Sequence, residues 1–201
     1  MHKLILRREM PSGNPICDDP LLDRLYRSRH IKNSQELDRT LASMHNPNLM
    51  SGVDSAVKLL VEAYQKQQRI VIVGDFDADG ATSTALAVLA LRQLGFVNVT
   101  YLVPNRFEQG YGLSVAVAQE ALALDVELLI TVDNGVSSHE GVAFLKTQGV
   151  KVIVTDHHLP PQKLPNADAI VNPNLAHCGF PSKNLAGVGV TFYLMLADRK
   201  S

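Results

Sequence analysis

Cysteine is scarce in this sequence: Cys17 and Cys178 are the two cysteines among 201 residues, and they stand far apart. Neither belongs to a Cys-x-x-Cys or Cys/His ligand spacing, so we expect ordinary thiols of a reducing cytoplasm. Long apolar runs are also missing, since none approaches the roughly 18 residues that a membrane-spanning helix needs. The start of the chain has three consecutive apolar residues, too few for a signal peptide. These absences favour a cytoplasmic protein without a membrane segment.

An excess of charge of one sign is missing as well. The 19 basic and 20 acidic side chains leave a formal net charge of −1. Bulk electrostatic attraction therefore cannot drive binding to nucleic acid, and any such binding has to come from a local patch. The apolar content of 46% is ample for a packed core, and the length predicts one domain with an appendage.

Residues 1–50 differ in character from the rest and predict a short, mostly helical segment. Leu21–Ser28 and Ser34–Met44 have helical patterns, and Asn33 and Glu36 are placed as a capping box for the second. A solvated charged face is the simpler interpretation of the basic residues here, and a surface that contacts a polyanion is the alternative. These basic residues are Arg24, Arg27, Arg29 and Lys32.

Residues 51–201 predict a separate α/β domain. Ser51–Gln68 has the spacing of an amphipathic helix, and strands and helices alternate after it. The expected strands are 70–73, 97–103, 127–132, 151–155 and 169–171. The expected helices are 82–94, 114–124, 138–148 and 185–198. This alternation predicts a parallel, doubly wound sheet with helices on both faces, which binds ligands at the carboxyl ends of its strands.

The most informative stretch follows the first expected strand. Asp75, Asp77 and Asp79 are spaced by two, so an extended chain would point their carboxylates the same way, and Gly80 permits a tight turn. Carboxylates that converge repel one another unless a cation joins them, which predicts a metal site. An EF-hand fits poorly, because the twelfth position counted from Asp75 is Leu86 rather than Glu. A phosphatase of the haloacid dehalogenase type, with an Asp nucleophile, and an acidic turn without chemistry stay open.

Two further strands end in polar clusters that are expected at the same edge. Asp133-Asn134-Gly135 follows one strand, and Asp156-His157-His158 follows the next. Each alone has an ordinary explanation as a turn or an accident. Together they form an oxygen-rich set with imidazole and no thiolate, which suits manganese or magnesium, and so many carboxylates favour two metals over one.

At this point the sequence resembles the DHH phosphoesterase family, which is named for the triplet at 156–158. It is similar in particular to the family's single-strand-specific 5′→3′ DNA exonucleases. The resemblance rests on five ordered segments: 74–83, 103–114, 131–135, 155–160 and 185–190. The segment 103–114 separates these exonucleases from the family's pyrophosphatases and oligoribonucleases.

The resemblance implies roles for single residues. It implies a two-metal site for Mn²⁺ or Mg²⁺, with Asp133 as the bridging, catalytic ligand and His158 as a catalytic contact to the scissile phosphate. Asp75 and Asp156 would orient the ligands. The implied metal ligands are Asp77, Asp79, Asp133 and His157.

The same resemblance implies how substrate is held. Arg106 would hold a substrate phosphate, Tyr111 would stack on a base or else pack in the core, and Ser114 completes the substrate-binding set. The glycines at 187 and 189 are expected to allow close backbone approach. The implied partners are single-stranded DNA and, among proteins, a single-strand-binding protein and a helicase.

The family's exonucleases continue well beyond the length of this chain. They carry a further Asp ligand, a DHH-associated domain that closes over the cleft, and an OB-type domain. We therefore expect this chain to bind metal and to degrade DNA weakly or not at all. Two alternatives stay open: another DHH hydrolase, acting on nanoRNA, a cyclic dinucleotide or pyrophosphate, and a non-catalytic fragment that binds DNA or a partner.

Overall fold

The computed structural model describes residue 9 and residues 12–198. The amino-terminal stretch, on which the expectation about a signal peptide rests, lies outside the described residues. The chain divides into two compact units, residues 1–44 and residues 45–201, which are described separately. Residues 45–50, which the sequence analysis assigned to the amino-terminal segment, fall in the second unit.

The first unit contains one helix, α1 (Pro20–Ser28), among its described residues. Asp19 caps it by accepting hydrogen bonds from the Leu21 and Leu22 N–H groups. The predicted helix over 34–44 is wrong. Two 3₁₀ turns, η1 (Ser34–Leu37) and η2 (Leu41–Ser43), stand there instead.

The backbone at Asp38 explains this difference. Its ψ of 124° is extended, and its side chain accepts a hydrogen bond from the Thr40 N–H at 2.8 Å. Short polar side chains of this kind compete with helical hydrogen bonds. Asn33 does cap η1, while the Glu36 carboxylate accepts from the Lys32 N–H rather than from that of Asn33.

The second unit is built on a parallel sheet of five strands in the order β2-β1-β3-β4-β5. The strands are β1 (Ile70–Val73), β2 (Val99–Leu102), β3 (Leu128–Val132), β4 (Lys151–Thr155) and β5 (Ala169–Val171). Apart from β2, the strands have the expected bounds or differ from them by one residue. β2 is shorter than expected, and the valines that flank it, at 97 and 103, are 70% and 46% exposed.

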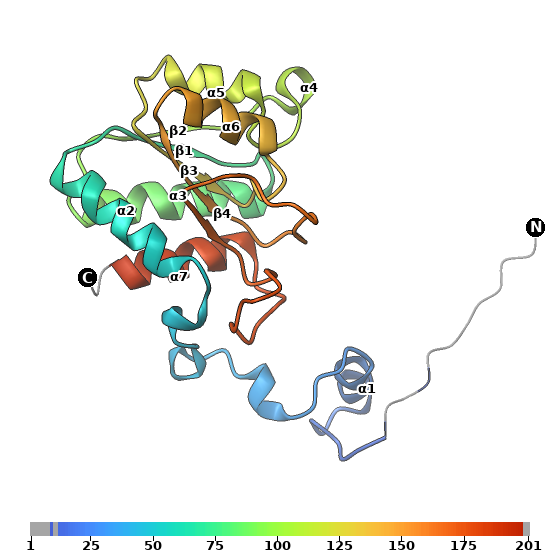
Figure 1. Cartoon of the computed structure of the whole chain (residues 1–201). Coiled ribbons are helices and arrows are strands. Elements are labelled where there is room, and N and C mark those ends of the chain that lie inside the picture. Colours follow the sequence, from blue (N-terminus) through green and yellow to red (C-terminus); the bar gives the residue numbers. More distant parts are fainter. Residues whose placement is uncertain (1–8, 10–11, 199–201) are drawn as a thin grey trace, which may run out of the picture. The chain divides into compact units, whose positions relative to one another are not determined.

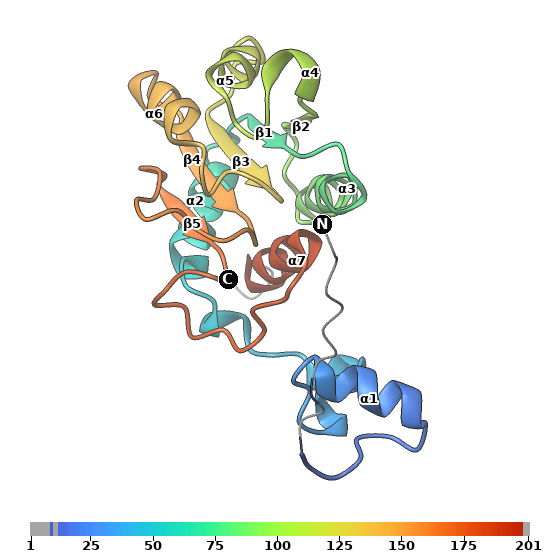
Figure 2. The same cartoon turned by 90° about the vertical axis from the view of Figure 1, so that its right-hand side faces the viewer.

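Helices cover both faces of the sheet, as the sequence predicts (Figure 1). The helices α5 (Val115–Leu122) and α6 (His139–Thr147) pack on one face, against valine and leucine side chains of β1, β3 and β4. The other face carries α2 (Val53–Gln65), α3 (Ala78–Gln93) and α7 (Gly187–Asp198), with α3 and α7 in extensive contact. Figure 2 shows the two groups on opposite sides of the strands.

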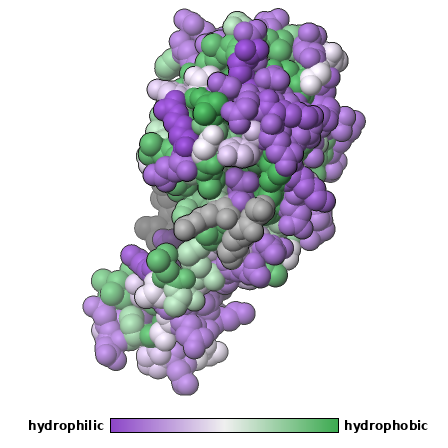
Figure 3. Space-filling model, turned by 90° about the vertical axis from the view of Figure 1, so that its left-hand side faces the viewer, coloured by the Kyte–Doolittle hydropathy of each residue, from purple (hydrophilic) through white to green (hydrophobic). Residues whose placement is uncertain are grey.

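Two short elements complete the unit: η3 (Pro47–Leu49), which contacts α7, and α4 (Arg106–Gln109), which the sequence analysis did not predict. Met50 is buried directly after η3, so the unit begins before the first long helix. No helix in the described part of the chain is long and apolar enough to span a bilayer. Described residues of α3 and α7, together with Leu94, line an apolar groove of about 470 Å³. Figure 3 views the molecule from the side where α7 ends and shows hydrophobic residues interspersed with hydrophilic ones on that face.

The strand order places the switch point between β1 and β3. From β1 the chain crosses to β2 on one side, and β3 then lies on the other side of β1. In open parallel sheets the crevice at such a point, outside the carboxyl ends of the strands, is where ligands bind. The polar segments after β1, β3 and β4 all meet there.

Candidate metal centre

The segment after β1 turns at once into a helix, which corrects the extended arrangement that the sequence suggested. Asp77 caps α3, because its Oδ1 accepts the Gly80 N–H at 2.9 Å, and α3 begins at Ala78. Asp79 therefore lies in the first helical turn and points elsewhere: its two oxygens accept the Gly187 and Val188 N–H groups at the start of α7, each at 2.7 Å. The spacing of two residues in an extended chain did not account for helix capping, and capping sets the directions of these carboxylates.

Gly80 is required for close packing rather than for an unusual backbone angle. A Cβ at this position would lie 2.5 Å from the Asp75 carbonyl oxygen. Asp75 itself is buried and accepts the Phe76 N–H at 2.8 Å through Oδ1. The absent side chain at Gly80 thus allows the start of α3 to fold back onto the end of β1.

Asp133, at the end of β3, is the most enclosed acid of the site apart from Asp156. It is 2% exposed, and its φ of 61° lies in the left-handed region, which Asp tolerates better than most residues. Its Oδ1 makes no hydrogen bond to any described residue. Gly187 packs against it so closely that an added Cβ would lie 2.4 Å from that oxygen.

The end of β4 holds its two histidines through backbone and carboxylate contacts. Asp156 is buried, and its Oδ1 accepts the N–H groups of His157 and His158 and also contacts the His158 Nδ1 at 2.7 Å. Its Oδ2 accepts the Val136 N–H at 2.8 Å. The Oδ1 of Asp156 therefore holds the loop that carries the histidines, and its Oδ2 connects this loop to the segment that follows β3.

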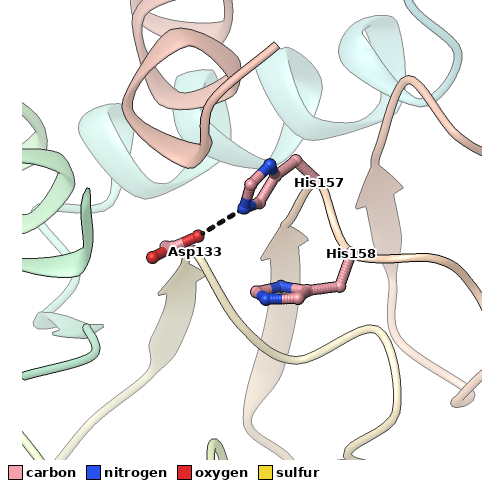
Figure 4. A group of neighbouring side chains, drawn as sticks. All are labelled: Asp133, His157 and His158. Carbon is pink, nitrogen blue, oxygen red and sulfur yellow. Dashed lines mark ion pairs between the residues drawn. The ribbon is translucent and has the colours of Figure 1, made fainter. Parts of the chain in front are cut away.

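His157 faces Asp133 with a lone pair. Its Nδ1 lies 2.9 Å from the Leu185 carbonyl oxygen, which can only accept, so Nδ1 carries the proton in the neutral ring. Its Nε2 then presents a lone pair to the Asp133 Oδ1, 3.0 Å away (Figure 4). Two lone pairs at this distance repel unless a proton or a metal ion lies between them, and a carbonyl acceptor on the second nitrogen is the usual arrangement of a metal-bound histidine.

Burial and the charges around the site together raise the pKa values of Asp133, His158 and Tyr111. Burial, together with the negative charges of Asp79 and Asp77, raises the pKa of Asp133 to about 7. Burial lowers the pKa of His158, but the hydrogen bond to Asp156 and the charges of Asp156 and Asp133 outweigh it, so the net pKa lies above the usual value. The centre as a whole therefore favours positive charge, whether as protons or as a cation.

Asp133 is common to two groups of residues, and within each group the ligand atoms lie within 4.8 Å of one another. These groups are Asp75, Asp77 and Asp133, and Asp133, His157 and His158. Asp79 lies beside the second group, with its Oδ2 3.7 Å from the His157 Nε2. The set of carboxylate and imidazole donors, with no thiolate, fits Mn²⁺ or Mg²⁺, and the Asp133 Oδ1 gives such an ion a ligand that no hydrogen bond occupies.

Three of the residues implied as metal ligands, Asp77, Asp133 and His157, belong to the two groups that share Asp133. Asp75, expected only to orient ligands, belongs to an acidic group with Asp77 and Asp133, whereas Asp79 is held by the amides of α7. We name Asp133, Asp156, His157 and His158 the strand-end group, since they follow β3 and β4. Its acids are almost entirely buried.

An exposed rim borders this group. Arg106, at the start of α4, contacts the Asp75 carboxylate at 3.0 and 3.2 Å and lies over the ring of Phe76. Tyr111 is half exposed, so it is not a core residue, and its hydroxyl is 3.4 Å from the His158 Nε2. We name Phe76, Arg106 and Tyr111 the rim. Phe76 was not among the predicted site residues, although its place between Asp75 and Asp77 in the sequence could have indicated a role at the site.

Ser114 directly precedes α5. Its side chain caps α5 by accepting the Val117 N–H at 3.3 Å. It also lines a cavity of about 480 Å³ that includes Tyr111 and His158. The structure thus places Ser114 next to the site and gives it a local structural role.

The model of the DHH family, N-terminal domain, matches residues 69–201. The chain belongs to the DHH family. The single-stranded-DNA-specific exonuclease RecJ of Haemophilus influenzae is 73% identical over 199 residues, which are 99% of this chain and 35% of that protein. RecJ of Escherichia coli is 59% identical over 180 residues, 90% of this chain and 31% of that protein. This DHH chain thus spans about a third of the length of the curated relatives it matches.

Solved structures agree with the assignment to the DHH family. A crystal structure of exonuclease RecJ bound to manganese has a TM-score of 0.68 and 38% sequence identity, and the match covers 75% of this chain and 38% of that one. RecJ of Thermus thermophilus in complex with Mn²⁺ has a TM-score of 0.67 and 33% identity, over 87% of this chain and 24% of that one.

Proposed function

We propose that this chain is the metal-binding part of a phosphodiesterase that removes nucleotides from the 5′ end of single-stranded DNA, with two Mn²⁺ or Mg²⁺ ions as cofactors. The observation that carries the proposal is the buried Asp133 Oδ1, which accepts no hydrogen bond from a described residue and lies 3.0 Å from the His157 Nε2. The high identity to single-stranded-DNA-specific exonucleases supports the substrate, and the manganese-bound relatives support the cofactor.

Asp77, Asp79, Asp133 and His157 would hold the ions, as the resemblance implies. Asp79 remains able to do so although two amides bind it, since a carboxylate has about four lone-pair sites. Asp75 lies close enough to Asp77 and Asp133 to join them or to orient them. Bound ions of this kind activate a water and stabilise the leaving oxygen of a phosphodiester.

The remaining residues act on the substrate. Asp156 fixes the His158 Nδ1, and the raised pKa of His158 favours an imidazolium whose Nε2–H can donate to a phosphate oxygen. Arg106 offers a guanidinium next to the acidic group, and Tyr111 offers a ring on which a base can stack in a sequence-tolerant way. Ser114 would line the substrate side of the neighbouring cavity.

We further infer a role in DNA repair and recombination in the cytoplasm, alongside a single-strand-binding protein and a helicase. The similarity to the exonucleases supports these inferences, and the two free cysteines agree with a reducing compartment.

Manganese titration by calorimetry tests the metal site, and turnover tests the substrate. We expect the wild-type chain to bind Mn²⁺ and to bind a 5′-phosphorylated oligothymidylate more tightly than the matching duplex, with slow release of nucleotides at most. Faster hydrolysis of pyrophosphate, a cyclic dinucleotide or nanoRNA than of single-stranded DNA would favour another DHH hydrolase. Absence of Mn²⁺ binding would contradict the proposal.

A further inference from the structure

Phe76 has an unusual position for a large apolar residue. It stands between two acids of the metal centre, Asp75 and Asp77, and 56% of it is exposed. Burial of apolar surface therefore does not account for its place, because more than half of the residue stays in water. Its ring instead contacts the guanidinium cation of Arg106.

The guanidinium of Arg106 lies on the Phe76 ring, with Cζ 4.0 Å from the ring centroid. The Tyr111 ring is farther from the same guanidinium, at 5.1 Å. Both distances are within the range in which an aromatic face attracts a cation. Arg106 is thus held at a fixed place beside two rings, with Phe76 as the closer partner.

Only part of the guanidinium is used for hydrogen bonding. Its Nη2 makes both contacts to the Asp75 carboxylate, whereas Nε and Nη1 make no hydrogen bond to any described residue. The side chain of Arg106 is 45% exposed, so this free edge can reach a ligand. A planar guanidinium with an open edge is well suited to bidentate contact with a phosphate.

We propose that Phe76 is a positioning residue, which holds the plane of the Arg106 guanidinium so that its open edge can bind a substrate phosphate beside the metal centre. This proposal rests on the proposed function for the substrate. Phe76 acts through Arg106 and needs no contact with the scissile bond. The ion pair with Asp75 alone would fix one nitrogen but leave the plane free to rotate, and the ring removes that freedom.

The chain offers a matched control for this role. Phe107 is fully exposed and directly follows Arg106 in α4, and within the described part of the chain its ring makes no contact with the guanidinium. If any exposed apolar ring next to Arg106 were enough for substrate binding, loss of the Phe76 ring and loss of the Phe107 ring would weaken binding equally. If the stack on Arg106 matters, only Phe76 will respond to loss of its ring.

The first measurement reads the stack itself. In NMR spectra the ring current of Phe76 should shift the Arg106 Nε–H proton upfield in the wild-type chain. We expect Phe76→Leu to reduce this shift to the smaller part that the more distant Tyr111 ring causes, Phe76→Tyr to keep it and Phe107→Leu to leave it unchanged. An unshifted Arg106 proton in the wild type would overturn the proposal.

The second measurement reads its consequence by fluorescence anisotropy with a 5′-phosphorylated oligothymidylate in the presence of Mn²⁺. We expect Phe76→Leu to weaken binding about two- to fivefold, the range of an exposed cation–aromatic contact, with Mn²⁺ affinity unchanged. Phe76→Tyr should bind like the wild type. In an Arg106→Lys background, which lacks the planar fork, Phe76→Leu should have no further effect.

The outcomes separate this proposal from the proposed function. Equal losses in Phe76→Leu and Phe107→Leu, or an undiminished effect of Phe76→Leu in the Arg106→Lys background, would overturn the positioning role while leaving single-stranded DNA as the ligand. A wild-type chain that binds no oligonucleotide would instead contradict the proposed function, and the positioning role for phosphate with it, whatever the NMR shift shows.

Discussion

The strand-end group and the rim border the same centre but are built in opposite ways. Asp133 and Asp156 are 2% and 1% exposed, and backbone amides fix the loop that carries the histidines. Phe76 and Tyr111 are 56% and 49% exposed and make few hydrogen bonds. The hydrogen bonds of the buried Asp156 carboxylate favour a single arrangement of this loop, because each unmade hydrogen bond is costly. The strand-end group is thus suited to hold ions at fixed positions. The rim is suited to contact a substrate that changes its position relative to the site.

The comparison predicts the largest effect for the most buried metal ligand. Asp133→Ala removes the one residue common to both groups of ligand atoms. We expect Mn²⁺ affinity to fall by more than about 100-fold, the upper range seen for loss of a residue that only orients a ligand. Calorimetric titration measures this loss.

Asp168→Ala is the control for Asp133→Ala. Asp168 is an enclosed acid too, but it pairs with Lys146 and Lys151, and Lys151 begins β4 at the opposite edge of the sheet. Its loss should leave Mn²⁺ affinity unchanged. Equal losses of affinity in both variants would mean that unfolding, rather than a missing ligand, explains the result.

The raised pKa of Asp133 predicts an unusual pH dependence in the absence of metal. Because its folded-state pKa of about 7 exceeds the ordinary value of 3.8, the folded state binds more protons than the unfolded state between these values. The contribution of Asp133 to the free energy of unfolding should therefore decrease as pH rises from about 4 to about 7, at about 1.4 kcal/mol for each unit by which the two pKa values differ, and change little above. The raised pKa of His158 acts in the same direction, but from its ordinary value of 6.5 upward.

Urea unfolding of the wild type and of Asp133→Asn, with a chelator at pH 5 and pH 8, isolates the contribution of Asp133. The wild type should lose stability relative to Asp133→Asn as pH rises. Mn²⁺ should reverse the trend, since a ligand has to be deprotonated, and its affinity should rise about tenfold per pH unit up to about pH 7. A stability difference that is the same at both pH values would show that the carboxyl group titrates normally.

Gly187 gives a smaller, steric way to disturb the strand-end group. A Cβ there would lie 2.4 Å from the Asp133 Oδ1 and 2.7 Å from its Cβ, so Gly187→Ala has to displace a buried carboxylate. We expect a loss of about 1–3 kcal/mol in stability, as for other overpacked sites, and weaker Mn²⁺ binding. Gly179→Ala is the control, because its nearest neighbour is 3.8 Å away, and it should change neither quantity. Wild-type behaviour of Gly187→Ala would argue against this close packing.

The sequence predicted the strands and most helices well because buried β-branched runs and helical spacing depend on local patterns. Ile70–Val73 and Lys151–Thr155 have the expected bounds. The sequence also predicted that Asp133 and His157 lie at the same edge of the sheet, because the carboxyl ends of parallel strands lie side by side. The direction of Asp79 was not predictable in this way, since it depends on two amides of α7, more than 100 residues away.

The rim shows the same boundary between local and distant information. The resemblance of the segment 103–114 indicated that Arg106 and Tyr111 bind substrate. The residue spacing in this segment did not predict that Arg106 would pair with Asp75 and lie on the ring of Phe76. Such contacts join loops from different strands and depend on how the loops pack. The 3₁₀ turns in place of a helix at 34–44 have the opposite cause, a local polar competition at Asp38 that the apolar spacing concealed.

The smallest predicted effect belongs to the rim and tests whether it works through rings or through hydrogen bonds. The Tyr111 hydroxyl lies 3.4 Å from the His158 Nε2, a long contact for a hydrogen bond. Tyr111→Phe removes the hydroxyl but keeps the ring, so we expect affinity for an oligothymidylate to change less than about twofold, while Tyr111→Ala, which removes a stacking ring, should lose about fivefold or more. Fluorescence anisotropy measures both. A large loss in Tyr111→Phe would mean that this contact matters as much as the buried ones, and the contrast between the rim and the strand-end group would fail at this residue.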